Sequence, residues 1–253
     1  MNISLPTSKS IYFVSDSHLG APNAIKSREK ELRLIHWLNR VSVNAEAIFL
    51  LGDIFDFWFE YKTVVPKGFT RLFGKLAELT DRGISIYLFV GNHDLWMDDY
   101  FEKELGIPVF HKPLDLQVSG HSFLIGHGDG LGPGDTGFKL MKKVFTNPIC
   151  KTLFRWLHPD IGVKFAQYLS QRNKLISGDD DVHFLGEDKE WLVQYCKRKT
   201  SQKHRDHFIF GHRHLPMQVP IGDKGGLYTN IGDWCSHFTY GEFDGMSLNL
   251  KHD

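Results

Sequence analysis

Five short polar motifs in this sequence each follow a run of apolar residues, and their side chains are of the kinds that bind metal ions. The motifs are Asp16-Ser17-His18, Gly52-Asp53, Gly91-Asn92-His93-Asp94, Gly126-His127-Gly128-Asp129 and Gly211-His212-Arg213-His214. They offer carboxylate, amide and imidazole donors without a cysteine thiolate, a donor set that suits Mn²⁺, Fe or Zn²⁺. Two such ions held about 3.5–4 Å apart can clamp the attacking and leaving oxygens of a phosphoryl group. The motifs therefore predict a two-metal centre for phosphoryl chemistry.

The spacing within two of the motifs supports this interpretation. In an extended segment, every second side chain points to the same side. Asp16 and His18 can therefore reach one cavity, and so can His212 and His214. Taken alone, any one motif is more often a turn or a helix cap than a metal site. Five motifs in order, each after an expected strand, favour a shared metal site instead.

The apolar runs before the motifs have the length and the β-branched or aromatic content of buried strands. They cover residues 11–14, 47–51, 85–90, 122–125 and 207–210. Helical patterns over residues 27–41 and 67–82 separate the first three runs, so we expect parallel strand–helix–strand units within one five-stranded sheet. Ligands bind beyond the carboxyl ends of parallel strands, where the five motifs would converge. Short strands from Leu227 onward predict a second, partly antiparallel sheet packed on the first.

Composition limits the class of protein. The 253 residues, 42% of them hydrophobic, suffice for a substantial core, and we expect a single α/β domain over residues 1–253. The 30 basic and 30 acidic residues balance, which gives no overall attraction to nucleic acid. Three widely spaced cysteines argue against a disulfide framework. Without an apolar run long enough for a signal peptide or a membrane span, we expect a cytoplasmic protein, and we infer no obligate protein partner.

In this order the motifs DxH, GD, GNHD, GHGD and GHxH resemble those of the calcineurin-like metallophosphoesterase superfamily. The resemblance implies a two-sheet β-sandwich flanked by helices, and it implies roles for the motif residues. One metal would be held by Asp16, His18, Asp53 and His214, and the other by Asp53, Asn92, His127 and His212. By the same resemblance His93 would be the catalytic histidine, oriented by Asp94, that stabilises charge on the phosphoryl group or protonates the leaving oxygen.

Within the superfamily, the chain resembles the UDP-2,3-diacylglucosamine pyrophosphatases of lipid A biosynthesis. The segments that carry this resemblance are FVSDSHLG, LGDIFDFW, GHGDGLGPGD with the helical insertion after it, and GHRH followed by IGDW. It implies hydrolysis of UDP-2,3-diacylglucosamine to 2,3-diacylglucosamine 1-phosphate and UMP, typically with manganese, at the cytoplasmic face of the inner membrane. The residues implied to bind substrate are Asn92, His93, Asp135, Arg172, Lys174 and His212. The chain departs from this pattern at His93, where many of these enzymes carry Arg.

Residues 137–175 have the pattern of inserted helices, a lid, with breaks at Pro148 and Pro159. The insertion has more large apolar residues than a surface crossover needs. They are Phe138, Leu140, Met141, Val144, Phe145, Leu153, Phe154, Trp156, Leu157, Phe165 and Leu169. These side chains could line acyl chains, or could pack the insertion together and onto the domain. Its interleaved lysines and arginines could contact pyrophosphate or an anionic membrane, or could form a solvated basic face.

Two other functions remain open. A phosphodiesterase acting on nucleotides or other small phosphoesters needs aromatic stacking beside a basic track rather than an apolar slot. A non-catalytic scaffold of the same fold is expected to lack ligands or the pair His93 and Asp94, and this chain has them all. Hydrolysis of a lipid-linked nucleotide sugar at a two-metal centre is therefore the function that the sequence favours.

Overall fold

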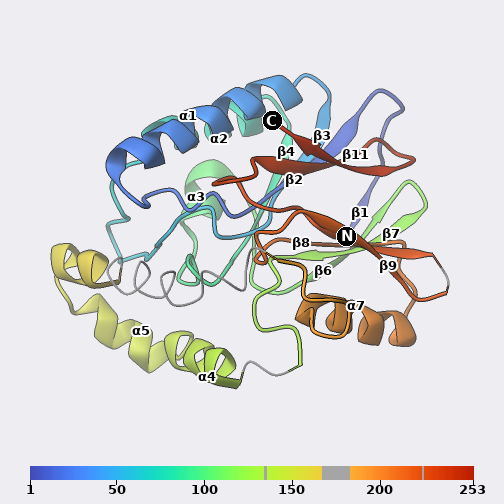
Figure 1. Ribbon diagram of the computed structural model, residues 1–253. Helices are drawn as coiled ribbons and strands as arrows, with labels where there is room; N and C mark the ends of the chain where they lie inside the picture. Colours follow the sequence, from blue (N-terminus) through green and yellow to red (C-terminus); the bar gives the residue numbers. More distant parts are fainter. Residues whose placement is uncertain (134–135, 167–182, 224) are drawn as a thin grey trace.

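The computed structural model describes residues 1–133, 136–166, 183–223 and 225–253, and two six-stranded β-sheets lie face to face in it (Figure 1). Helices α1 and α2 cover the outer face of one sheet, and α7 covers the outer face of the other. The helices with both ends among the described residues are α1 Ala24–Val41, α2 Thr70–Asp81, α3 Tyr100–Leu105, α4 Thr136–Phe145, α5 Pro148–Arg155 and α7 Trp191–Gln202. The expected α/β fold of two sheets flanked by helices is confirmed.

The first sheet has the strand order β12-β11-β2-β3-β4-β5. Its strands are β2 Ser10–Val14, β3 Ala45–Leu50, β4 Ser85–Phe89, β5 Val109–Phe110, β11 Thr239–Phe243 and β12 Leu248–His252. Strands β2 to β5 are parallel, and β11 runs antiparallel to both β2 and β12. Because α1 connects β2 to β3 and α2 connects β3 to β4, the expected parallel strand–helix–strand units are confirmed in this sheet.

The second sheet has the strand order β1-β6-β7-β8-β10-β9. Its strands are β1 Asn2–Ile3, β6 Leu114–Val118, β7 His121–Gly126, β8 His207–Phe210, β9 Met217–Ile221 and β10 Gly226–Asn230. β8 is parallel to both of its neighbours, β7 and β10, whereas β6 and β7, and also β9 and β10, pair antiparallel.

The expectation of a single sheet for the five motif-bearing strands is wrong. The first three apolar runs form β2, β3 and β4 of the first sheet, but the last two form β7 and β8 of the second. The strands expected from Leu227 onward divide as well, because β10 joins the second sheet while β11 and β12 join the first. The sequence of an apolar run does not indicate which sheet the strand joins, because strands that are buried on both faces have similar sequences in either sheet.

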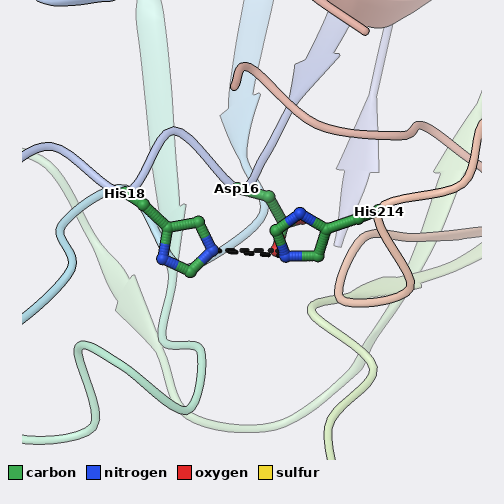
Figure 2. A group of neighbouring side chains, drawn as sticks. All are labelled: Asp16, His18 and His214. Atoms are coloured by element: carbon green, nitrogen blue, oxygen red, sulfur yellow. Dashed lines mark hydrogen bonds and ion pairs between the residues drawn. The ribbon is translucent and has the colours of Figure 1, made fainter. Parts of the chain in front are cut away.

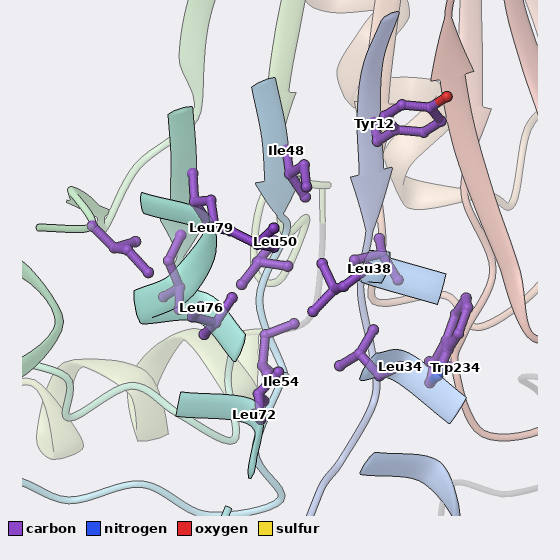
Figure 3. Packing of buried hydrophobic residues seen from close by; sticks show 14 of the residues in the cluster. Tyr12, Leu34, Leu38, Ile48, Leu50, Ile54, Leu72, Leu76, Leu79 and Trp234 are labelled. Carbon is purple, nitrogen blue, oxygen red and sulfur yellow. The ribbon is translucent and has the colours of Figure 1, made fainter. Parts of the chain in front are cut away.

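Side chains along β2 alternate between two cores. Ile11 and Phe13 lie between the two sheets, whereas Tyr12 and Val14 face the helices. Figure 3 shows the helix side, where leucines of α1 and α2 pack against the strands of the first sheet. Because both faces of β2 are packed, the backbone is held in place up to Val14. The first polar motif begins two residues later, at Asp16.

The two predicted helices of the first sheet are present, but their starts differ from the prediction. α1 begins at Ala24 rather than at residue 27, because the side chain of Asn23 accepts a hydrogen bond from the amide of Lys26 and caps the helix. α2 begins at Thr70 rather than at residue 67, because Gly68 and Phe69 have positive φ angles that a right-handed helix cannot contain.

Helix α7 was not predicted from the sequence pattern. Its residues Leu192, Val193 and Cys196 are buried and pack on Phe208 and Phe210 of β8, forming a third core on the outer face of the second sheet. None of the three cysteines, Cys150, Cys196 and Cys235, takes part in a disulfide bond. Among the described helices, none has the length and apolar content needed to cross a membrane.

The expected insertion is helical over α4 and α5, which lie outside the two sheets (Figure 1). The side chain of Asn147 caps α5 by accepting from the amide of Ile149, and Pro148 follows in the first turn. The predicted break at Pro148 therefore separates two helices. Neither α4 nor α5 contains a buried residue.

We expect Leu76→Ala to lower the free energy of unfolding by about 2–5 kcal/mol, because this leucine is fully buried between α2 and the first sheet. The same change at Leu140 of α4, whose side chain is 65% exposed, should alter stability by less than about 0.5 kcal/mol. Denaturant unfolding of both variants measures the difference. Equal losses would contradict the packing of α2.

Candidate metal centre

Hydrogen bonds join the loops that leave the two sheets. In the first sheet, the amide of Asp16 donates to the carbonyl of Gly52 at 3.1 Å. In the second, the amide of Gly211 donates to the carbonyl of His127 at 2.9 Å. Between the sheets, the amide of His212 donates to Oδ2 of Asp16 at 3.0 Å. The motifs therefore converge as expected, although they come from two sheets rather than one.

Asp16, His18 and His214 form the first group of candidate ligands, and Figure 2 shows their side chains converging. Nε2 of His214 lies 3.3 Å from Oδ1 of Asp16 and 3.3 Å from Nε2 of His18. Nε2 of His18 lies 3.9 Å from the same Oδ1. This Oδ1 is buried and accepts no hydrogen bond from the described residues. A cation among these three atoms would satisfy the buried oxygen and both nitrogens, so the residues fit a metal ion.

Asp53, His127 and His212 form the second group, with Asn92 beside it. Nε2 of His127 lies 3.3 Å from Oδ2 of Asp53 and 3.2 Å from Oδ1 of Asn92. On the other side of the His127 ring, Nδ1 lies 2.8 Å from the carbonyl oxygen of Leu51. That contact leaves Nε2 directed at the carboxylate and the amide, which suits a ligand nitrogen.

Burial and neighbouring charges shift the pKa values of the second group. Burial would raise the pKa of Asp53, but the charges of His127 and His93 outweigh it and hold the pKa of this carboxyl well below its usual range. Burial would lower the pKa of His127, yet Asp53 and Asp16 raise it to about 10. Burial and the charge of His127 lower the pKa of His212 to about 4. At neutral pH, His212 can therefore offer a lone pair to a metal, and His127 must release a proton to do so.

Backbone strain is concentrated in these loops. Positive φ angles between 42° and 66° occur at Asp16, His18, Asp53, His212 and His214. The left-handed region costs residues other than glycine on the order of 1–3 kcal/mol, and it persists only where surrounding contacts hold it. Such strain is typical of functional sites, and here it falls on five of the seven predicted ligands.

Two of the motif glycines leave room that a side chain would fill. A Cβ atom on Gly91 would lie 2.2 Å from Oδ1 of Asp53, and one on Gly211 would lie 2.4 Å from Oδ2 of Asp16. The expectation that glycines relieve crowding beside the ligands is confirmed at these two positions.

Two aspartates for which the sequence predicted no role lie beside the Nδ1 atoms of ligand histidines. Oδ1 of Asp56 lies 3.4 Å from Nδ1 of His18, and Oδ2 of Asp233 lies 3.4 Å from Nδ1 of His214. A carboxylate at Nδ1 fixes the ring and leaves Nε2 to the metal, as in many metal sites. Asp56 follows Asp53 in GDIFD and Asp233 lies in IGDW, so acidic residues near the predicted ligands were the available signal.

His93 lies at the edge of the first group. Its ring meets that of His18 edge-on, with centroids 4.6 Å apart, and its side chain is 15% exposed. Its amide donates to Oδ1 of Asp53 at 2.8 Å. Nδ1 of the ring lies 3.0 Å from the carbonyl oxygen of Asp56. The ring is therefore held by Asp56 and stays partly open to solvent.

The expectation that Asp94 orients His93 needs correction. The Asp94 carboxylate is fully buried and accepts hydrogen bonds from backbone amides, of Gly91 at 2.7 Å and of Ile54 at 2.9 Å among them. Burial and the charge of Asp53 raise the pKa of Asp94 to about 7. Adjacent residues in a loop send their side chains in different directions, so Asp94 ties two motif loops together while Asp56 contacts the ring.

The predicted substrate residues are only partly within the described chain. Asn92, His93 and His212 lie at the two groups. Asp135, Arg172 and Lys174 lie outside the described residues. The roles of all six in binding substrate stay predictions.

The family model for calcineurin-like phosphoesterases matches residues 9–218, and the chain belongs to this family. Among its curated relatives, the UDP-2,3-diacylglucosamine hydrolase of Porphyromonas gingivalis is 36% identical over 95% of this chain and 96% of its own length. The protein of the same name from Pseudomonas fluorescens is 28% identical over 88% of this chain and 87% of its own. A metallophosphoesterase uses divalent metal ions, and the donor groups described above could hold them.

We expect Gly91→Ala to lower the bound metal per chain, because the added Cβ would displace the Asp53 carboxylate. Gly74→Ala is the matched control, since its Cβ would meet nothing within 4 Å and should stabilise α2 by about 0.5–1 kcal/mol. Elemental analysis of folded protein loaded with Mn²⁺ compares the two. Unchanged metal content in Gly91→Ala would show that Asp53 is not where the metals bind.

Proposed function

We propose that this chain hydrolyses the pyrophosphate bond of UDP-2,3-diacylglucosamine, releasing UMP and 2,3-diacylglucosamine 1-phosphate, with two divalent metal ions, Mn²⁺ first among them. The observation that carries the proposal is the 36% identity to a hydrolase of that name over nearly the whole of both chains. Three donor groups among the described residues could hold a metal ion, and the third joins His18, Asp56 and His93. The groups around Asp16 and Asp53 support the reaction class, because both offer mixed oxygen and imidazole ligands.

The residues divide into two ligand sets. Asp16, His18 and His214 would hold one ion, and Asn92, His127 and His212 the other. Asp53 would be shared, because its Oδ2 lies 3.3 Å from Nε2 of His127 and 3.8 Å from Nε2 of His18. Two bound divalent ions supply Lewis-acid stabilisation of phosphoryl charge and a lowered pKa for bound water.

His93 is suited to act on the substrate rather than on a metal. Its Nδ1 is engaged by the Asp56 carbonyl, which leaves Nε2 for the phosphoryl group or the leaving oxygen. Its side chain is 15% exposed, so a substrate can reach the ring. The resemblance places Arg at this position in many of the related enzymes, and a histidine here lacks the permanent charge and the forked donors of Arg.

The insertion has two kinds of apolar side chain. Phe145 and Phe154 pack on Trp96 with ring centroids 5.7 and 4.8 Å away, as expected if these residues hold the insertion on the domain. Phe138 instead lies over His212, at a centroid distance of 6.4 Å, and Met141 follows one turn later on α4. We assign the acyl-chain contact to this second kind, beside the proposed metal centre.

Several basic residues of the insertion form ion pairs that hold it on the rest of the domain. Lys142 pairs with Asp129, and Lys151 and Arg155 both pair with Asp98, at 2.5 and 2.8 Å. These contacts favour a tethering role over a pyrophosphate contact, which was one of the alternatives left open for them. They join α4 and α5 to loops beside the proposed metal centre.

The outer side of the insertion is apolar and supports a place at the membrane surface. Ile149 and Trp156 are 69% and 81% exposed, and they lie about two turns apart on one side of α5. Lys143 is exposed on neighbouring α4. Aromatic and aliphatic side chains beside lysine are typical of segments that dip into an anionic bilayer surface. We therefore propose that the chain works at the cytoplasmic face of the inner membrane, where its lipid substrate would lie.

We expect His93→Ala to retain both metals and to lower kcat by about 10²–10⁴-fold, the range for one group acting on the transferred proton or charge. Metal content and turnover measured on the same preparation separate the two effects. Loss of metal from the variant would make His93 a ligand instead.

We expect Met141→Ser to raise KM for UDP-2,3-diacylglucosamine roughly ten-fold, because about two methylene contacts at about 0.8 kcal/mol each are lost. Hydrolysis of bis-p-nitrophenyl phosphate, a small soluble diester, should stay unchanged. Ile25→Ser is the control, an exposed apolar side chain on α1 away from the insertion.

Equal effects of Met141→Ser on both substrates would mean that the residue only supports the fold. If wild-type protein hydrolysed UDP-sugars with and without acyl chains at the same kcat/KM, the acyl contact would be wrong. A nucleotide phosphodiesterase would then be the better assignment.

A further inference from the structure

A lysine of α1 contacts the backbone of the loop that carries Asp16 and His18. Lys30 is only 8% exposed, and its Nζ donates to the carbonyl oxygens of Ser17 and His18, both at 2.7 Å. Nζ also lies 3.4 Å from Sγ of Cys235. An ammonium group has three N–H donors, and two of them are directed at carbonyl oxygens of the same loop.

The loop needs such support because its backbone is strained. Asp16 and His18 have φ angles of 55° and 42°, in the left-handed region that residues with a Cβ rarely adopt. The carbonyl groups held by Lys30 belong to Ser17 and His18, so the contacts act on the strained segment itself. Relaxing this segment would turn the side chains of Asp16 and His18 away from each other.

Burial of the ammonium also indicates a dedicated contact. A buried charge is unfavourable unless it is fully hydrogen-bonded, and surface lysines normally keep Nζ in water. Lys30 has its Nζ beneath the predicted ligands instead, with both loop carbonyls as acceptors.

We propose that Lys30 is a positioning residue for the first ligand group, an inference that rests on the metal centre proposed above. Its ammonium holds the Ser17 and His18 carbonyls and so keeps Asp16 and His18 directed at one point. The second group depends on other contacts, those of Leu51 with His127 and of Asp94 with the amides near Asp53. Loss of Lys30 should therefore disturb one metal site and spare the other.

The chain offers a matched control in Lys75 of α2, which is also 8% exposed. Its Nζ donates to both carboxylate oxygens of Glu78 at 2.8 Å, on the same helix and away from the motif loops. Lys30→Met and Lys75→Met remove the same charge from equally buried positions of neighbouring helices.

The test is calorimetric titration of metal-free protein with Mn²⁺, together with thermal unfolding of the same samples. Wild type and Lys75→Met should bind two ions with equal affinities. In Lys30→Met, one of the two sites should weaken by about 10–100-fold, the usual effect of losing support behind a ligand. Two unchanged sites in Lys30→Met, or equal weakening in both variants, would overturn the role of Lys30.

A fold defect is distinguished by the unfolding curves. If Lys30→Met does not fold, Lys30→Gln is titrated instead. Its amide is uncharged and ends one atom short of Nζ, so it cannot keep both contacts of 2.7 Å, and an unchanged first site there overturns the proposal equally. Should wild-type protein itself bind fewer than two ions, the proposed metal centre fails before the role of Lys30 is tested.

Discussion

A buried carboxylate must be paired with positive charge or with hydrogen-bond donors. Asp53 is such a carboxylate, and its partners lie in the other motifs that meet around it. Its Oδ1 accepts from the amide of His93, and its Oδ2 lies near Nε2 of both His127 and His18. The Asp53 amide donates in turn to Asp94, at 3.3 Å. Residues that follow β2, β3, β4 and β7 therefore surround one anion. Two divalent ions sharing that anion would complete the same pattern with stronger charges.

Both sheets are needed for this arrangement. β2, β3 and β4 bring the acidic motifs and His93, while β7 and β8 bring His127, His212 and His214. The loops have a strained backbone. Hydrogen bonds between the two sheets, such as the one from the amide of His212 to Asp16, hold them in this conformation. The packed cores on both faces of each sheet fix the strand ends from which the loops start. The sandwich thus serves as the frame of the site.

Much of this could be predicted from the sequence, because metal-ligand types at regular places after apolar runs are a local signal. The motifs, the α/β class and the parallel units around α1 and α2 follow from it. Pairing of distant strands is not local, so β7 and β8 were assigned to the wrong sheet. Contacts of individual side chains were missed for the same reason. The ring of His93 is held by Asp56 rather than Asp94, and Lys30 reaches the ligand loop from a helix whose pattern indicated only an amphipathic surface.

Crystals grown with Mn²⁺ would test most directly whether two metal ions share Asp53. Anomalous difference maps at the manganese absorption edge locate each ion independently of the protein phases. We expect two peaks, one among Asp16, His18 and His214 and one among Asn92, His127 and His212, with the Asp53 carboxylate between them. A single peak, or peaks that leave Asp53 unliganded, would contradict this arrangement.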